Sequence, residues 1–168
     1  MFGIVNCLSY LEIFTSNSNL NFNNSIIHEV VSIFLRANND SYLMQLRDNK
    51  SSIVFPGHWG LFGGAIESGE TACEAASREL EEEIEISVVP EEIYEFRQYI
   101  QSNYIVHTCY YNLKTPLSKL NLQEGADLGL FSINEILRGR LFSQKFHKYF
   151  LVADPLIGYF RDVSELNK

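Results

Sequence analysis

Three glutamates, Glu79, Glu82 and Glu83, are spaced so that one face of a helix would carry all of them. At about 100° per residue, their side chains fall within roughly 100° of one another on a helical wheel. Three like charges at this spacing repel one another in water. A hard divalent cation such as Mg2+ or Mn2+ reverses that repulsion, because it prefers oxygen ligands. The spacing therefore indicates a metal site, and the small side chains of Ala72 and Ala75 on the same face would leave room for ions and phosphate.

The helix that would carry these carboxylates has a clear start signal. Thr71 and Glu74 form the T-x-x-E pattern of a capping box, so the helix should begin near Ala72. Apolar side chains cluster on a second face, about 110° away from the acidic one on the wheel. The other acids, Glu74, Glu81 and Glu85, point to a third side, where we expect an exposed, solvated surface.

A glycine-rich segment comes directly before this helix. Gly63 and Gly64 follow His58 and Trp59 closely, and paired glycines let the backbone approach a ligand. On its own, such a pair is typical of an ordinary tight turn. Beside an acidic helix face, we interpret Gly63 and Gly64 as the rim of a phosphate site, with Trp59 as a candidate substrate contact.

Residues 64–86 together resemble the Nudix box, the motif of the Nudix hydrolases. The motif reads G-x5-E-x7-R-E-U-x-E-E-x-G-U, where U is a bulky apolar residue, and every fixed position but one is matched. Glu85 stands where the motif has glycine, near the helix end, where glycine is favoured because it takes a left-handed conformation. We therefore expect a strained or altered helix exit, with the metal ligands intact.

The resemblance implies metal-dependent hydrolysis of a pyrophosphate bond in a nucleoside diphosphate linked to another moiety. Mg2+ or Mn2+ would be the cofactor, held by Glu79, Glu82 and Glu83 together with a backbone carbonyl near Gly63. A nucleoside triphosphate or a nucleotide sugar is the favoured substrate. The alternative is a Nudix-fold nucleotide-binding or regulatory module without activity, although such modules usually lack some of the box carboxylates, which are all present here.

The resemblance also assigns supporting roles. It implies that Glu70 and Arg78 form a structural pair that braces the glycine loop and orients Glu79. The general base stays open among Glu79, Glu83 and Glu124, because its place varies within the family.

Other candidate site residues lie outside the box. Residues 122–127 form a loop in which many Nudix enzymes carry an acid that completes the metal site or acts as the base. Glu124 is the candidate, Asp127 is the alternative, and a solvated turn is the competing interpretation. The resemblance to the first Nudix hairpin makes Arg47, at the end of an apolar run, a candidate substrate contact. Tyr104 is a further one, because it lies near a tyrosine position of one Nudix subgroup.

The elements that must position these residues follow from hydrophobic patterning and turn signals. We expect an α/β protein of the Nudix type, an α/β/α sandwich around a mixed sheet. Residues 26–168 would form one Nudix domain, after an N-terminal extension and an Asn- and Ser-rich linker at 1–25. A capping box at Ser132 and Glu135 predicts a second helix. Strands are predicted at 26–35, 41–47, 93–100, 104–113 and 128–131, and a C-terminal helix at 143–153.

Composition limits the classes of function. The net charge of −8 over 168 residues argues against general nucleic-acid binding. The three cysteines, Cys7, Cys73 and Cys109, lack metal-binding spacing and predict reduced thiols in the cytoplasm. No apolar run approaches the roughly 18 residues of a membrane span, so no membrane partner is expected. No Lys or Arg precedes Arg36, which argues against a classical secretory signal. A small-molecule nucleotide is the expected partner, and analogy with the family suggests a homodimer.

Overall fold

The fold of this chain is known from a computed structural model, which describes residues 28–37, 40–101 and 103–166. The extension and linker expected at 1–25 lie outside the described residues. The elements are β1 (His28–Ala37), β2 (Ser41–Leu46), β3 (Trp59–Gly60), α1 (Ala72–Ile84), η1 (Pro90–Glu92), β4 (Tyr94–Gln101), β5 (Tyr104–Asn112), η2 (Leu117–Lys119), β6 (Asp127–Ser132), α2 (Ile133–Ile136), β7 (Arg140–Ser143), β8 (Lys148–Leu151) and α3 (Asp154–Leu166).

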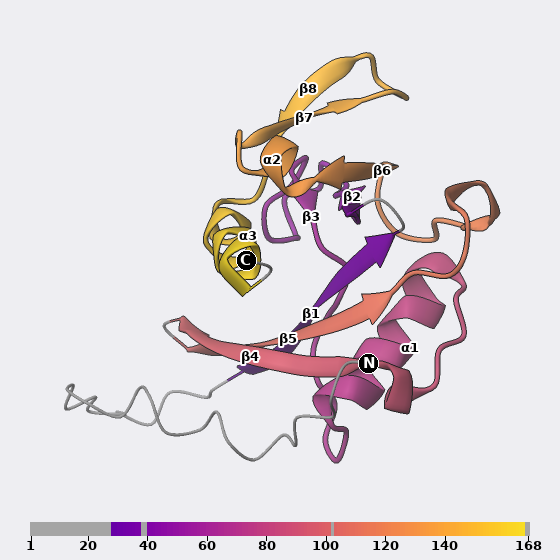
Figure 1. The fold of residues 1–168 in the computed structure, drawn as a ribbon, viewed down its shortest axis with the longest axis vertical. Helices are drawn as coiled ribbons and strands as arrows, with labels where there is room; N and C mark the ends of the chain where they lie inside the picture. Colours follow the sequence, from indigo (N-terminus) through magenta and orange to yellow (C-terminus); the bar gives the residue numbers. More distant parts are fainter. Residues whose placement is uncertain (1–27, 38–39, 102, 167–168) are drawn as a thin grey trace.

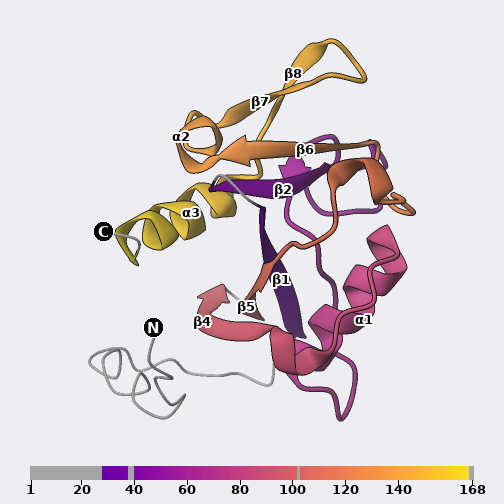
Figure 2. The same cartoon turned by 45° about the vertical axis from the view of Figure 1, so that its right-hand side comes forward.

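A mixed sheet forms the centre of the molecule (Figure 1). Its order is β3-β2-β1-β5-β4, and β6 also pairs with β2. β1 and β5 run parallel, whereas the other neighbours in the sheet run antiparallel. β7 and β8 form a separate antiparallel hairpin beyond β6 (Figure 2).

Helices cover both faces of the sheet, and each covers a hydrophobic core. On one face, α1 packs its apolar residues, including Leu80 and Ile84, against Ile33 and Leu43 of the sheet. On the other face, Phe160 of α3 packs with Phe34. These two layers confirm the expected α/β/α sandwich. None of the helices in the described part of the chain is long and apolar enough to cross a membrane.

The predicted strands correspond to β1, β2, β4, β5 and β6, with small shifts at their ends. The predicted capping boxes are both present. The Thr71 side chain accepts a hydrogen bond from the Glu74 backbone N–H at the start of α1, and Ser132 does the same with Glu135 at the start of α2. Strong local signals therefore predicted the elements that surround the glutamates.

The prediction of a helix at 143–153 is wrong. The β7–β8 hairpin occupies that stretch, and α3 begins after it, at Asp154. Asp154 and Pro155 directly follow the expected helix and are compatible with a helix end, because the residue before a proline favours an extended backbone. Proline is also favourable in the first turn of a helix, where its missing N–H needs no partner. Here Pro155 therefore starts a helix, and the aromatic Tyr149 and Phe150 before it suit a strand.

Candidate active site

Glu83 is the most buried of the box carboxylates. Only 6% of this residue is exposed to solvent, which is rare for a residue with a carboxylate side chain. Its Oε1 accepts a hydrogen bond from Gln45 Nε2 at 3.1 Å, and its Oε2 accepts one from the Gly63 backbone N–H at 3.1 Å. Burial raises the pKa of Glu83 to about 7, because the ionised form loses its hydration; the two donors act against this, and the charges of Glu79 and Glu124 add to it.

The two glycines of the loop are required by close contacts. Gly63 has a φ of +135°, and a Cβ there would lie 2.1 Å from the Val31 carbonyl oxygen. A Cβ on Gly64 would lie 2.3 Å from Glu79 Oε1. At Gly63 the loop thus approaches β1 more closely than any other residue type allows, whereas a Cβ at Gly64 would displace the flexible Glu79 carboxylate.

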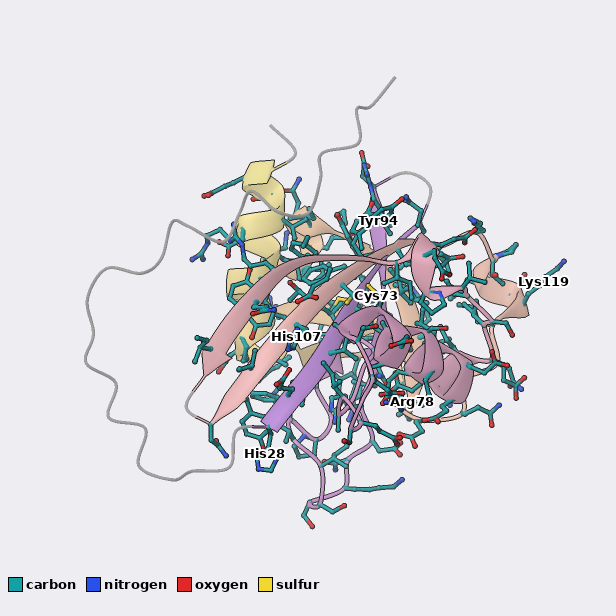
Figure 3. All side chains as sticks on the ribbon, turned by 90° about the horizontal axis from the view of Figure 1, so that it is seen from below. His28, Cys73, Arg78, Tyr94, His107 and Lys119 are labelled. Carbon is teal, nitrogen blue, oxygen red and sulfur yellow. The ribbon has the colours of Figure 1, made fainter. Side chains whose placement is uncertain are left out.

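Arg78 connects the loop to the helix. Its Nε and Nη2 donate to the two carboxylate oxygens of Glu70 at 2.8 and 3.0 Å, and Nη2 also donates to the Ala65 carbonyl at 2.9 Å. Its Nη1 donates to Glu79 Oε1 at 2.7 Å. The bonds from Arg78 lower the pKa of Glu70 to about 2. Arg78, which Figure 3 shows on α1, thus contacts Glu70, the loop and Glu79, and the bracing role of this pair stays a prediction.

Glu79 and Glu82 lie beside Arg78 but differ in exposure. The Glu79 side chain is 12% exposed, and burial raises its pKa, although the Arg78 hydrogen bond opposes the shift. The Glu82 side chain is 60% exposed, and its Oε2 lies 3.5 Å from Arg78 Nη1. Glu79 and Glu83 therefore converge on the Gly63–Gly64 loop, and Glu82 lies at the solvent edge of the same face.

The structure distinguishes the two acids proposed for the loop at 122–127. Both carboxylate oxygens of Asp127 are engaged within the protein. Oδ2 accepts a hydrogen bond from Ser143 Oγ, and Oδ1 accepts one from the Leu128 backbone N–H. Glu124 is exposed, and its charge raises the pKa of both Glu79 and Glu83. Glu124 therefore lies within electrostatic reach of the carboxylate pair, whereas Asp127 fixes the loop.

Several contacts hold this loop in place. The Gln123 backbone N–H donates to the Glu83 carbonyl at 2.8 Å, and the Ala126 N–H donates to the Leu46 carbonyl at 2.7 Å. Lys145 Nζ, in the turn between β7 and β8, donates to the Ala126 carbonyl at 2.7 Å. Gly125, which precedes Ala126 in the loop, has a φ of +100°.

Sequence reasoning missed Gln45, Ser143 and Lys145. Gln45 carried a signal, because it is the one amide side chain within the otherwise apolar run 42–46, and such a polar residue in a strand needs a partner. Ser143 and Lys145 had no such signal in the sequence, because their bonds to the loop depend on the β7–β8 hairpin, which was not predicted.

The mismatched position in the box keeps the backbone that the motif requires. Glu85 caps α1 with φ 56° and ψ 40°, which is left-handed, and its N–H donates to the carbonyls of Leu80 and Glu81. Its carboxylate accepts from Asn121 Nδ2 at 2.8 Å and from Gln123 Nε2 at 2.6 Å. The expected strained exit is present, and these two bonds tie it to the loop that carries Glu124. Glu74 and Glu81 are exposed, as the wheel predicts.

Three candidate substrate contacts lie elsewhere or are already engaged. Trp59 is fully buried and donates its indole N–H to the Leu141 carbonyl, so it packs in the core. Tyr104 lies at the start of β5, where its ring centroid is 5.3 Å from that of His28. Arg47 Nε donates to the Val54 carbonyl at 2.7 Å, which ties it to the loop before β3.

The donor set suits a hard divalent cation. Glu79, Glu82, Glu83 and Glu124 offer only carboxylate oxygens, which Mg2+ and Mn2+ prefer. Burial of Glu79 and Glu83 with raised pKa values leaves two carboxylates that a cation would stabilise. Within the described ranges, no group of three or more His, Cys, Asp or Glu side chains is arranged so that it could hold a metal ion by itself. Water and phosphate oxygens would therefore fill the rest of the shell, as is usual for Mg2+.

Comparison with known proteins gives matches in sequence. The model of the NUDIX domain family matches residues 27–150. The nucleoside triphosphatase NudI of Salmonella agona is 48% identical over 48 residues, which are 27% of this chain and 33% of that protein. NudI of Escherichia coli O139:H28 is 46% identical over 48 residues, 28% of this chain and 33% of that protein. The chain thus matches about a third of the length of these curated relatives.

Solved structures share the fold. A MutT protein from Methanosarcina mazei has a TM-score of 0.65 at 20% identity, covering 86% of this chain and 98% of that one. A NUDIX-family hydrolase from Clostridium perfringens has a TM-score of 0.56 at 16% identity, covering 84% and 99%. At this identity the likeness concerns the arrangement of the elements.

Proposed function

This chain belongs to the Nudix family, and on that premise we propose that it hydrolyses a pyrophosphate bond in a nucleoside diphosphate linked to another moiety. The observation that carries the proposal is the convergence of a buried carboxylate, Glu83, and a partly buried one, Glu79, on the Gly63–Gly64 loop. A nucleoside triphosphate is the favoured substrate, supported by the similarity to NudI, and a nucleotide sugar is the second choice.

The residues of the chain hold and orient the reacting groups. Glu79, Glu82, Glu83 and Glu124 would bind Mg2+ or Mn2+, together with a backbone carbonyl near Gly63. When bound, this cation neutralises the pyrophosphate and polarises the attacked phosphorus. The missing side chains at Gly63 and Gly64 leave the loop backbone open to phosphate oxygens.

A carboxylate must also take the proton of the attacking water. The water oxygen forms a bond to phosphorus, the bridging P–O bond breaks, and the proton passes to the base. Glu79, Glu83 and Glu124 are the candidates, and Glu124 is exposed, with its charge acting on both Glu79 and Glu83. The products are a nucleoside monophosphate and a phosphorylated second moiety, which is pyrophosphate when the substrate is a triphosphate.

A substrate panel tests the proposal. The protein is incubated with Mg2+ or Mn2+ and nucleoside triphosphates, nucleotide sugars, dinucleoside polyphosphates or ADP-ribose, and phosphate is measured after a coupled phosphatase step. We expect turnover that requires the metal and is greatest with a triphosphate. Glu83→Gln should lose at least about a hundredfold in kcat/KM, because a metal ligand is removed.

Glu81→Gln is the matched control, because Glu81 is exposed on the same helix and should keep full activity. Full activity of Glu83→Gln would show that the metal role is wrong. No turnover of any substrate would favour the inactive nucleotide-binding module.

We also infer a cytoplasmic location and a homodimer. The location is supported by Cys109, whose buried thiol is not in a disulfide, and by the absence of metal-binding spacing among the cysteines. The homodimer is supported by analogy with the family alone. Sedimentation analysis would test it, since a single monomeric species at micromolar concentration would contradict it.

A further inference from the structure

A groove of about 540 Å³ lies between β6 and the β7–β8 hairpin. Pockets for small ligands usually have volumes of roughly 300 to 1,000 Å³. In Figures 1 and 2 the hairpin lies on the far side of β6 from α1, so this groove is separate from the box carboxylates. The residues that matter for its chemistry are Leu130, Arg138, Arg140, Phe142, Gln144 and Tyr149.

The hairpin concentrates positive charge in an acidic protein. Residues 136–153 contain Arg138, Arg140, Lys145 and Lys148 but no Asp or Glu, whereas the whole chain has a net charge of −8. The whole-chain charge therefore conceals a local excess of cations, and two of them line the groove. A segregation of this kind raises the local concentration of anions.

The two arginines of the groove are available to a ligand. Among the residues that the structure describes, neither Arg138 nor Arg140 has a carboxylate within ion-pair distance, whereas Arg36 and Arg97 each have one. Glu135 also lines the groove and interacts with Arg138 through its charge. Its carboxylate is engaged at the start of α2, where it accepts from Ser132 N and Oγ at 2.9 and 2.7 Å.

An exposed aromatic ring accompanies the arginines. Tyr149 is 61% exposed, which is unusual for so large a side chain, and the Arg140 guanidinium lies 5.4 Å from its ring centroid. Phe142 supports the ring in an edge-to-face contact with centroids 5.2 Å apart. A ring, two guanidiniums and the amide of Gln144 together match a ligand that is planar, aromatic and anionic.

We propose that this groove is a second nucleotide-binding site, which takes a free mononucleotide without a metal ion. Guanidinium groups bind phosphate oxygens through paired hydrogen bonds, so Arg138 and Arg140 would hold the phosphate. The base would stack on Tyr149, with Gln144 in place to hydrogen-bond its edge. The volume suits one nucleotide, and the net charge of −8 opposes a long polyanion.

Binding of AMP in EDTA separates this site from the box carboxylates. AMP has no anhydride bond to hydrolyse, and without a metal the acidic face of α1 repels phosphate. Calorimetric titration of the full chain should show one saturable site whose affinity falls as salt increases. Arg138→Gln with Arg140→Gln should weaken it at least about tenfold, because charged hydrogen bonds are lost.

Matched variants make the result specific. Arg161→Gln removes one charge from the exposed face of α3, away from the groove, and should bind AMP as the wild type does. Tyr149→Leu should weaken AMP but leave the affinity for inorganic phosphate unchanged. Thermal unfolding checks that each variant is folded.

Three results would overturn the proposal. They are no AMP binding in EDTA, equal binding by the double arginine variant, and much tighter binding of a single-stranded oligonucleotide, which would make the hairpin a nucleic-acid surface. Metal-dependent hydrolysis is measured in parallel and should persist in the arginine variant. A failure of the second site is thus distinguishable from a failure of the proposed hydrolysis.

Discussion

Glu83 combines burial with two hydrogen-bond donors, and these act on its pKa in opposite directions. Gln45 and Gly63 stabilise the carboxylate, but burial outweighs them and raises its pKa from 4.5 to about 7. A side chain in this state is poised to bind either a proton or a cation. At neutral pH it therefore suits a site that exchanges a proton for a metal ion.

The stability of the metal-free protein should depend on pH through Glu83. Because its pKa in the folded state is raised, the stabilisation is full below pH 4.5 and is lost as pH rises through about 7. Urea unfolding should show the wild type losing on the order of 2 kcal/mol relative to Glu83→Gln between pH 5 and 8. Parallel pH profiles of the two proteins would contradict this account of Glu83.

Gly64→Ala should reduce activity more than stability. The added Cβ would lie 2.3 Å from Glu79 Oε1, and the carboxylate, at the end of a flexible side chain, can move away. We expect kcat/KM to fall by about a hundredfold, since small misplacements of a catalytic group cost this much. Gly158→Ala, with open space around it in α3, is the control and should keep activity while stabilising by about 0.5–1 kcal/mol. Normal kinetics of Gly64→Ala would refute the close approach.

At the scale of elements, the exit of α1 shows how a mismatch in the box is accommodated. Glu85 is left-handed, which costs about 1–2 kcal/mol for a residue with a Cβ, and its bonds to Asn121 and Gln123 offset part of this. Glu85→Ala and Glu85→Gly both lose the two bonds, but alanine keeps the conformational cost, whereas glycine removes it. Chemical denaturation should find the glycine variant more stable than the alanine variant by about 1 kcal/mol. The reverse order would mean that the exit is not left-handed.

The turn of the β7–β8 hairpin should act on catalysis through the loop that carries Glu124. Lys145→Met removes the bond to the Ala126 carbonyl, and we expect kcat to fall about three- to tenfold. If Lys145 only positions Glu124, the double variant with Glu124→Gln should be no slower than Glu124→Gln alone. Lys148→Met, on the same hairpin but without a bond to the loop, is the control. If the losses in kcat from Lys145→Met and Glu124→Gln multiply in the double variant, this coupling is contradicted.

The elements also show where sequence reasoning reaches its limit. The start of α1 was predictable because Thr71 and Glu74 act on each other locally. The hairpin was not, because Asp154 and Pro155 permit either a helix end or a helix start. The bonds from Ser143 and Lys145 depend on this hairpin, so they could not be predicted either.

At the scale of the whole molecule, the sheet brings together residues that are distant in sequence. Gln45 of β2, the Gly63–Gly64 loop, α1 and the loop at 122–127 meet at one end of β2. The wheel predicted that Glu74 and Glu81 are exposed to solvent, because helix geometry is local. The positions of Trp59 and Tyr104 could not be predicted from local patterns, because their surroundings depend on how the strands and α3 pack.

The molecule also separates its charges. Glu79, Glu82 and Glu83 of α1 belong to the proposed metal site, and the cations at 138–148 belong to the segment that lies beyond β6 (Figure 1). If both sites bind phosphate, they must do so by opposite means, one through a divalent cation and the other through guanidinium groups. The requirement for a metal is therefore the property that distinguishes them.

Direct titration with Mn2+, followed by electron paramagnetic resonance, tests the central claim that one face of α1 holds the metal. The wild type should bind Mn2+, Glu83→Gln should bind it at least about tenfold more weakly, and Glu81→Gln should match the wild type. Both substitutions remove one carboxylate from the same helix, so only position differs. Equal affinities for Glu83→Gln and Glu81→Gln would contradict the account.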